Sequence, residues 1–370
     1  MSVNQYKESA YPLVKELCKI PAPSGLEEKR AEFCKKYLID AGYDNVYIDD
    51  AKNVICGIGC ENSSEITVFA AHTDTVFPDL EPMPYKEEGN LAHCPGIGDN
   101  TASVAVLLVA AKYFKDNNIS SDKGILFVFN SCEEGLGNLK GTRALMDAYK
   151  GKIANFIALD GTLDRIVYKC VGSHRYNVEV KTEGGHSFNA FGNENAINHL
   201  SKIINKIYEI EVPVIDDSKT TYNVGTISGG TSVNTIAQSV NMLCEYRSDD
   251  VECLAIMQKK FEEIFESVRN DKVEVIVEKV GDRPCAEGVD EGVLSEFVSE
   301  CKEIIEKIID KEVKIDSGST DCNIPASLGV PALCIGSCYG GGAHTREEWI
   351  NIESLNQGLD VAIEIIKAYI

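Results

Sequence analysis

Apolar runs that stop abruptly at polar residues are the main pattern in this chain of 370 residues. The first clear example is Ile66 to Ala71, which contains almost only β-branched, aromatic or small side chains and is followed by His72-Thr73-Asp74. A short run of this kind predicts a strand that is buried on both faces of a parallel sheet. Since ligands bind beyond the carboxyl ends of such strands, His72 and Asp74 are candidates for a functional site.

The same pattern recurs further along the chain. Apolar runs cover residues 125–129, 156–159 and 332–335, and the loops that follow them contain, in turn, Glu133 with Glu134, Asp160, and His344. Asp99 is a further candidate, because it lies just before a helix that we expect to begin near Thr101. Histidines combined with carboxylates suit divalent metals such as zinc, manganese or cobalt, and no thiolate is needed. The alternative is a set of polar residues that only solvate the loops.

Helical patterns separate the predicted strands. Residues 6–42 predict two helices with a break at Pro21 to Gly25, and we expect Ser24 or Gly25 to begin the second helix. Residues 101–115 are rich in Ala, Val and Leu, which predicts a helix buried against the sheet. These patterns indicate an α/β fold with a mixed, mostly parallel sheet flanked by helices.

The pattern changes near Cys170. Residues 176–181 alternate apolar and polar side chains, as in a strand with one face in water. The segments that follow predict the order β-α-β-β-α-β, which is the split βαβ arrangement of ferredoxin-like domains. We therefore expect residues 171–283 to form an inserted α+β lid domain. Residues 1–170 and 284–370 both supply candidate ligands, so we expect them to form one catalytic domain.

Charge and composition exclude several classes of partner. The formal net charge of -22 repels phosphate backbones and no Lys/Arg cluster offsets it, so we expect no nucleic-acid partner. The longest apolar run, Val104 to Ala111, is far shorter than the roughly 20 residues of a membrane helix, so we expect no membrane partner. The N-terminus lacks the features of a signal peptide, which favours a cytoplasmic location. The 14 cysteines are interpreted as small buried hydrophobes.

The candidate ligands suit the hydrolysis of an amide bond. Ligands from separate strand ends can hold two metal ions close together if one carboxylate bridges them, and such ions activate water and polarise a carbonyl group. Neighbouring residues in extended backbone point to opposite sides, so one of Glu133 and Glu134 can bind metal while the other accepts a proton. His72 and Asp74 share a face, so Asp74 can hydrogen-bond the imidazole and fix its tautomer.

Several motifs in this chain resemble those of a known family. In chain order they are HTDTV, GIGDN, SCEEG, ALDG, GGHSFNAFGNENAI, GGTSVNTIA, EYRSDD, STDCN and GGGAHTREEWI. Together they resemble the M20 metallopeptidases, and within that family the tripeptide aminopeptidase (peptidase T)-like branch. The resemblance implies a zinc-peptidase-like catalytic domain with an inserted lid and two divalent metal ions, zinc in the first place and manganese or cobalt as alternatives. It implies the following ligands, with Asp99 as the bridge: His72, Asp99, Glu134, Asp160 and His344.

The same resemblance assigns roles to further residues. Glu133 is implied as general base and acid, and Asp74 as the residue that orients His72. His186 is implied as the group that contacts the carbonyl oxygen of the substrate. In dimeric relatives this histidine comes from the lid of the partner, so a homodimer through the lid is an expectation.

Two more lid residues, Asn234 and Arg247, match residues that hold a substrate carboxylate. On the residues alone, His186 also reads as an exposed histidine on a turn. Arg247 has the alternative of pairing with Asp249 or Asp250.

The leading interpretation is an aminopeptidase that acts on di- or tripeptides. Asp160, where some relatives carry glutamate, favours a peptidase over a deacylase. The alternatives are an N-acyl amino acid deacylase or carboxypeptidase of the same family, and a non-catalytic metal-binding protein. Recognition of a free amine separates the two enzymes, and the sequence does not reveal it. Loss of Glu133 or of a ligand would favour the non-catalytic alternative, and neither is lost.

Overall fold

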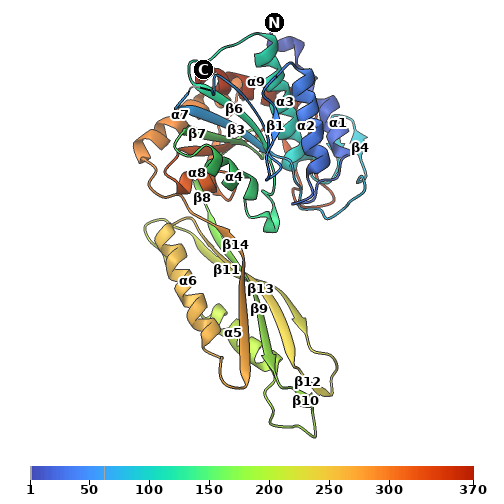
Figure 1. The fold of residues 1–370 in the computed structure, drawn as a ribbon, viewed down its shortest axis with the longest axis vertical. Helices are drawn as coiled ribbons and strands as arrows, with labels where there is room; N and C mark the ends of the chain where they lie inside the picture. The colour runs from blue at the N-terminus through green and yellow to red at the C-terminus, as the bar shows by residue number, and fades with distance from the viewer. Residues whose placement is uncertain (1, 62) are drawn as a thin grey trace. The chain divides into compact units, whose positions relative to one another are not determined.

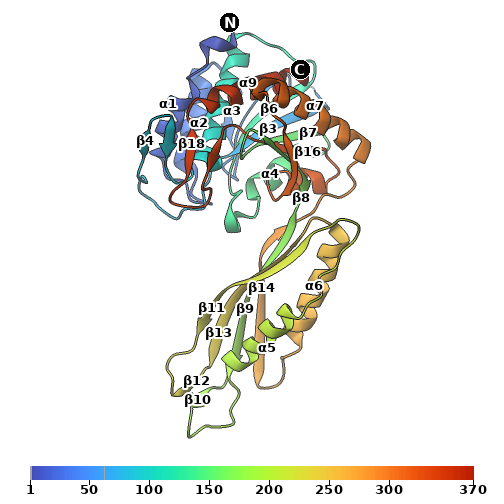
Figure 2. The same ribbon diagram turned by 180° about the vertical axis from the view of Figure 1, so that it is seen from behind.

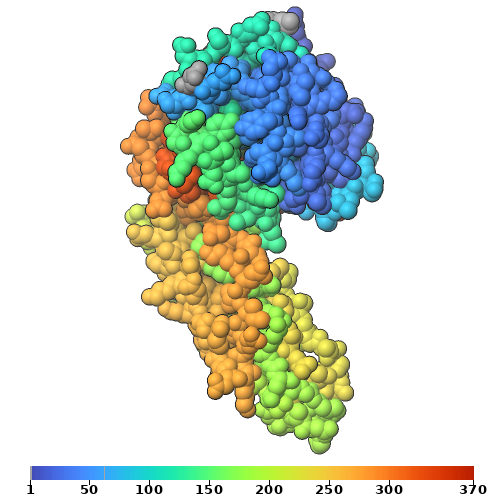
Figure 3. Space-filling model, viewed as in Figure 1, coloured from blue at the N-terminus to red at the C-terminus, as the bar shows by residue number. Residues whose placement is uncertain are grey.

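The computed structural model describes residues 2–61 and 63–370. These residues divide into two compact units, one containing the chain up to Cys170 together with Glu287–Ile370, the other containing Val171–Ala286. The first unit is therefore built from both ends of the chain. In the space-filling view its surface carries blue N-terminal and orange to red C-terminal segments, whereas the second unit is green, yellow and orange (Figure 3).

An eight-stranded sheet forms the centre of the first unit, in the order β1-β2-β6-β3-β7-β16-β8-β15. The central strands β6, β3, β7 and β16 run parallel, whereas β2 is antiparallel to β6, and β8 is antiparallel to β16. This confirms the predicted mixed, mostly parallel sheet. The strands have the following bounds: β1 Tyr47–Ile48, β2 Val54–Ile58, β3 Ile66–His72, β6 Gly124–Asn130, β7 Ile153–Leu159, β8 Arg165–Cys170, β15 Lys314–Gly318 and β16 Ala332–Ile335.

Strand β3 has the environment that its apolar run predicts. Each of its residues is buried, and it is paired on both sides by parallel strands. His72, its last residue, lies opposite Asn130, the last residue of β6. The carboxyl ends of the parallel strands therefore meet at one edge of the sheet, where the polar residues that follow them can come together.

Helices cover both faces of this sheet (Figures 1 and 2). On one face lie α1, α2, α3, α7 and α9, which share a large apolar core with the inner side chains of the strands. On the other face α4 contacts α8. No helix of the described residues has the length and apolarity of a membrane span. The helix bounds are α1 Ala10–Cys18, α2 Glu28–Asp40, α3 Ser103–Asp116, α4 Lys140–Ala148, α7 Glu291–Ile309, α8 Asn323–Ser327 and α9 Ser354–Ala368.

A second, small sheet of the first unit has the order β17-β18-β5-β4. Its strands contain only two or three residues each, too few to carry a periodic pattern, and the sequence did not predict them. Their bounds are β4 Lys86–Glu88, β5 Leu91–His93, β17 Gly340–Gly341 and β18 Trp349–Asn351. Pairing of β18 with β5 brings the segment around His344 beside the segment that leads to Asp99.

The second unit is an antiparallel sheet with helices on one face. Its strand order is β11-β13-β9-β14, and α5 and α6 pack on this sheet over an apolar core of their own. The succession β9-α5-β11-β13-α6-β14 is the predicted ferredoxin-like order. A separate pair, β10 Gly185–His186 and β12 Thr235–Ile236, extends from it. The main elements are β9 Gly172–Thr182, α5 Ala196–Tyr208, β11 Thr220–Gly229, β13 Ser239–Ser248, α6 Val251–Glu266 and β14 Val273–Arg283.

The predicted start of the second helix was wrong. Helix α2 begins at Glu28, and neither Ser24 nor Gly25 caps it. The Ser24 hydroxyl instead donates a hydrogen bond of 2.6 Å to Asp74 Oδ2. A serine before an acidic turn is a local capping signal, and here a tertiary hydrogen bond uses the same hydroxyl.

Helix α9 supplies a test of the packing. A Cβ atom added at Gly358 would overlap with the carbonyl oxygen of Ser337. Gly358→Ala should therefore lower the free energy of unfolding by about 1–3 kcal/mol in denaturant titrations, although alanine is the better helix former. The control is Gly292→Ala in α7, where an added Cβ would meet only the Asp290 side chain, at 3.2 Å. Equal stability of the Gly358→Ala protein and the parent would contradict this packing.

Candidate active site and metal centre

The candidate ligands come from separate ends of strands and helices. His72 ends β3, Glu133 and Glu134 follow β6, and Asp160 follows β7. Two further candidates come from connecting segments. Asp99 lies in the short helical segment Ile97–Ala102 that leads into α3, and His344 lies between β17 and β18. The fold therefore brings residues that are distant in the sequence to one edge of the central sheet.

Asp99 lies between the two histidines. Its Oδ1 is 3.1 Å from Nε2 of His72, and its Oδ2 is 3.0 Å from Nε2 of His344. Each histidine has a second carboxylate nearby: Nε2 of His344 is 3.2 Å from Oε1 of Glu134, and Nε2 of His72 is 3.9 Å from Oδ2 of Asp160. The site thus contains two groups of donors, and Asp99 contributes one oxygen to each.

The donor atoms fit a metal site by a second criterion. Nε2 of His72, Oδ1 of Asp99 and Oε1 of Glu134 are buried and have no hydrogen-bond partner of good geometry among the residues described. One ligand atom from each of these residues can be chosen so that all lie within 4.8 Å of one another. Buried polar atoms without hydrogen bonds are costly, so this arrangement is explained if the atoms coordinate a cation.

The electrostatics of the site also favour a cation. Burial opposes ionisation of Asp99, yet the nearby imidazoles of His344 and His72 lower the pKa of this carboxyl group. Burial and the neighbouring charge of Asp99 raise the pKa of Asp160 well above its usual value. The nearby carboxylates of Asp99 and Glu134 raise the pKa of His344 to about 10. The site thus holds more carboxylates than positively charged groups, and a bound cation would offset this excess of negative charge.

Asp74 connects the histidine to the glutamate loop. Its backbone oxygen accepts a hydrogen bond of 3.1 Å from Nδ1 of His72, and its Oδ1 lies 3.4 Å from the same nitrogen, which leaves Nε2 of the neutral ring free to bind a metal. Its carboxylate also accepts hydrogen bonds from the backbone N–H groups of Glu133, at 3.0 Å, and Glu134, at 2.9 Å. Asp74 therefore contacts both His72 and the loop that carries Glu133 and Glu134. The sequence predicted only the contact with His72.

Glu133 lies beside this cluster. Only 6% of its surface is exposed, and its charge contributes to the raised pKa of Asp160. The preceding residue, Cys132, has a φ of 57°, which is unusual for a residue other than glycine and turns the chain sharply after β6. This turn places Glu133 near Asp160 while Glu134 faces His344.

Three residues that support the site were missed by the sequence reasoning. Ser24 donates to Asp74, as described above. The buried Glu27 accepts a hydrogen bond of 3.2 Å from the backbone N–H of Cys132. The buried guanidinium of Arg30 donates to backbone oxygens, including a bond of 3.0 Å to Thr73. A charged residue inside an amphipathic helix has no sequence signal that distinguishes it from a surface residue.

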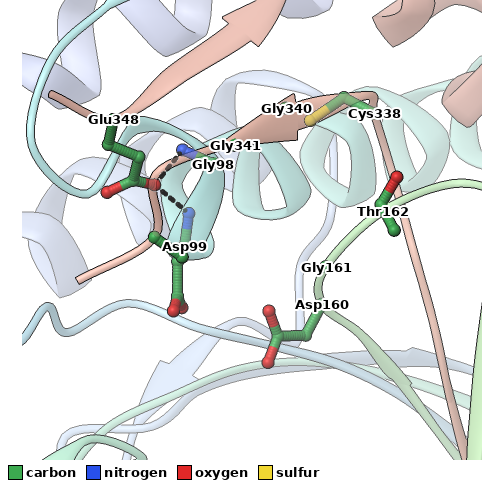
Figure 4. Close-up of a pocket in the computed structure, with 10 residues that line it drawn as sticks. Gly98, Asp99, Asp160, Gly161, Thr162, Cys338, Gly340, Gly341 and Glu348 are labelled. Carbon is green, nitrogen blue, oxygen red and sulfur yellow. Dashed lines mark hydrogen bonds between the residues drawn. The ribbon is translucent and has the colours of Figure 1, made fainter. Parts of the chain in front are cut away.

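A pocket of about 180 Å³ opens beside the ligands, and the Asp99 and Asp160 carboxylates point into the same space (Figure 4). Small residues form most of its wall, so a small organic group fits next to the candidate ligands. Besides the two aspartates, its lining contains Gly98, Gly161, Thr162, Cys338, Gly340, Gly341, Ala343 and Glu348.

The candidate residues of the second unit lie at two places. His186 and Asn234 are close together, because β10 pairs with β12 and the backbone N–H of Ser187 donates to the backbone oxygen of Asn234. Arg247 lies near the far end of β13, opposite Ser173. Its guanidinium donates two hydrogen bonds, of 2.8 and 3.1 Å, to Glu245.

Comparison with known proteins extends over both units. The model of peptidase family M20/M25/M40 matches residues 68–368. Succinyl-diaminopimelate desuccinylase of Corynebacterium glutamicum is 25% identical over 365 residues, with 97% of this chain and 95% of that protein covered. The aminopeptidase PepT of Bacillus cereus has a TM-score of 0.76 at 24% identity, and a Staphylococcus aureus tripeptidase has 0.77 at 23%, each covering 98% of both chains. These two structures share the predicted fold.

Asp74→Asn tests the link between His72 and the glutamate loop. Both carboxylate oxygens accept N–H groups, so the amide must turn its NH₂ toward one of these donors. We expect the affinity for zinc to fall about 10–100-fold, as is usual for groups that orient ligands. Competition with a chromogenic chelator measures this affinity, and Asp122→Asn at an exposed position is the control. Unchanged affinity in Asp74→Asn would show that the loop holds its position without this carboxylate.

Proposed function

Because this chain belongs to peptidase family M20/M25/M40, a family of metal-dependent hydrolases of peptide and amide bonds, we propose that it is an aminopeptidase acting on di- or tripeptides. The observation that carries the proposal is the position of Asp99, with one oxygen toward each of two histidines. The choice of short peptides is supported by the names of the Bacillus cereus and Staphylococcus aureus structures, which share this fold over 98% of both chains.

The donor groups can be assigned to two metal ions. His72, Asp160 and Oδ1 of Asp99 would hold one ion, and His344, Glu134 and Oδ2 of Asp99 the other. When bound, the ions supply polarisation of the substrate carbonyl group and a nucleophile at neutral pH. Zinc suits this donor set, and manganese and cobalt are the alternatives.

Glu133 is the proposed proton carrier. It lies beside the ligands, and Asp74 holds its backbone N–H. In this role its carboxylate takes a proton from the attacking water and gives it to the leaving amine. Glu134, the next residue, faces His344 and is thereby available as a ligand.

The hydrogen bonds of His186 favour the tautomer that its proposed role requires. The ring Nδ1 accepts from the backbone N–H groups of Phe188, at 3.3 Å, and Asn189, at 3.4 Å. The proton of the neutral ring therefore lies on Nε2, which can donate to a developing negative charge on the substrate oxygen.

The positions of the proposed substrate-binding residues in the second unit support the proposal of a homodimer. His186 and Asn234 lie beyond the end of β13 at Ser239, whereas Arg247 lies at its other end. At about 3.3 Å per residue this separation is roughly 25 Å, too long for one small peptide. We infer that His186 and Asn234 of one copy act with Arg247 of a second copy.

A second candidate function is the removal of an acyl group from an amino acid. It is favoured by the desuccinylase of Corynebacterium glutamicum, which aligns with 97% of this chain at 25% identity. The same metal ligands and the same base would serve this reaction. The two candidates differ in whether the substrate carries a free amino group.

Hydrolysis of a tripeptide beside its N-acetylated form decides between them. We expect the zinc-loaded protein to cleave only the free peptide. Cleavage of the acetylated form alone would transfer the assignment to a deacylase or carboxypeptidase, and zinc binding without either activity would favour the non-catalytic alternative. Two variants serve as matched controls: Glu133→Gln should keep its metal and lose about 10²–10⁴-fold in turnover, whereas Glu134→Gln should lose metal affinity.

Mixing two inactive variants tests the homodimer. His186→Ala and Glu133→Gln chains should together recover about a quarter of the wild-type activity, because half of the randomly formed dimers are mixed and each has one intact site. The control mixture pairs Glu133→Gln with His344→Ala, which leaves no intact site. Mixed dimers that are detected by native mass spectrometry without any recovery would place His186 and the metal ligands of one chain in the same site.

A further inference from the structure

Glu348 is a buried acidic residue with no part in the proposed reaction. Only 1% of its surface is exposed. Its Oε1 accepts hydrogen bonds from the backbone N–H groups of Gly98, at 2.7 Å, and Asp99, at 2.8 Å, and its Oε2 accepts one from Gly96, at 2.6 Å. Figure 4 shows the bonds to Gly98 and Asp99, with the Asp99 carboxylate on the side of the pocket.

These N–H groups belong to the segment that positions Asp99. The segment leads into α3, and Asp99 itself has a non-helical backbone, with φ −115° and ψ 88°. N–H groups at the start of a helix lack acceptors within the helix and need partners elsewhere. The Glu348 carboxylate provides these partners from a distant part of the chain.

Glu348 also belongs to the segment that carries His344. It directly precedes β18, which pairs with β5 through Trp349 and His93, and its backbone oxygen accepts from the Cys94 N–H at 3.2 Å. Beyond the ends of the two strands, the Glu348 side chain adds the hydrogen bonds to the N–H groups of Gly96, Gly98 and Asp99. Glu348 thus joins the two segments whose side chains, Asp99 and His344, approach each other to 3.0 Å.

The lack of a side chain at Gly98 allows the close approach of the Glu348 carboxylate. A Cβ atom at this position would lie 3.1 Å from Oε1 of Glu348, which is closer than most carbon–oxygen contacts of a side chain. The absence of a side chain allows the carboxylate to reach two successive N–H groups.

We propose that Glu348 is a positioning residue that holds Asp99 so that its two oxygens face the two donor groups. The proposal rests on the proposed metal-dependent function. It assigns to Glu348 an effect on metal affinity and on turnover, and no contact with the substrate. Residues that orient metal ligands commonly change affinity or activity by about 10–100-fold when they are replaced.

The test measures zinc affinity by chelator competition in Glu348→Gln and Glu348→Ala. In Gln the NH₂ group must face an N–H donor, and in Ala all three hydrogen bonds are lost. We expect zinc to bind about 10–100-fold more weakly, with the larger loss in Ala. With zinc at saturation we expect a lower kcat and little change in KM. The matched control is Glu347→Gln, since Glu347 is an exposed neighbour in the same segment.

A purely structural role is separated by the metal-free protein. Lower stability of the metal-free variants together with unchanged zinc affinity of the folded protein would overturn the proposal. If Glu348→Ala does not fold, Gly98→Ala tests the same contact while it keeps the carboxylate. Weaker zinc binding in Gly98→Ala, with no further loss in the Gly98→Ala, Glu348→Gln double variant, would support the proposal; independent, additive losses would overturn it.

Failure of the proposed function has a different signature. Because zinc affinity is measured without a peptide, it reports on Glu348 even if the wild-type protein cleaves no tripeptide. Absence of peptide cleavage with weakened zinc binding in the Glu348 variants would reject the substrate and keep the positioning role.

Discussion

The site depends on one carboxylate that is shared between two histidines. Oδ1 of Asp99 lies 3.1 Å from His72 and Oδ2 lies 3.0 Å from His344, so the two donor groups cannot be arranged independently. Glu134 and Asp160 add further negative charge in a buried environment, where unpaired charges are costly. The protein therefore has to hold mutually repelling groups together, and divalent cations would compensate this repulsion.

Buried hydrogen bonds from outside the donor set hold these groups in place. Asp74 fixes His72 from one side and the backbone of Glu133 and Glu134 from the other. Glu348 holds the backbone of Asp99 in a similar way. In both cases a carboxylate binds backbone N–H groups of a loop that carries a ligand. Such loops keep their geometry because their own polar groups are satisfied, and not only because a metal attracts their side chains.

The second unit carries its candidate residues at opposite ends of one sheet. β13 separates His186 and Asn234 from Arg247, so the length of a strand sets the distance between the groups that are proposed to contact the substrate. Two copies can bring such groups together where a single copy cannot. In the proposed enzyme, the ferredoxin-like unit would contribute substrate-binding residues from both ends of its sheet.

The sequence by itself determined the central strands and the candidate donors. A strand buried on both faces reads as a continuous apolar run, and the parallel order of such strands brings His72, Glu134 and Asp160 to one edge. The tertiary structure alone decided which groups hold these donors. Ser24 reads locally as a helix cap but donates to Asp74, and Glu348 precedes a strand too short to carry a periodic pattern. These contacts join segments that are 50 residues apart for Ser24 and Asp74 and 249 residues apart for Glu348 and Asp99. Local sequence patterns carry no information about partners that only folding brings together.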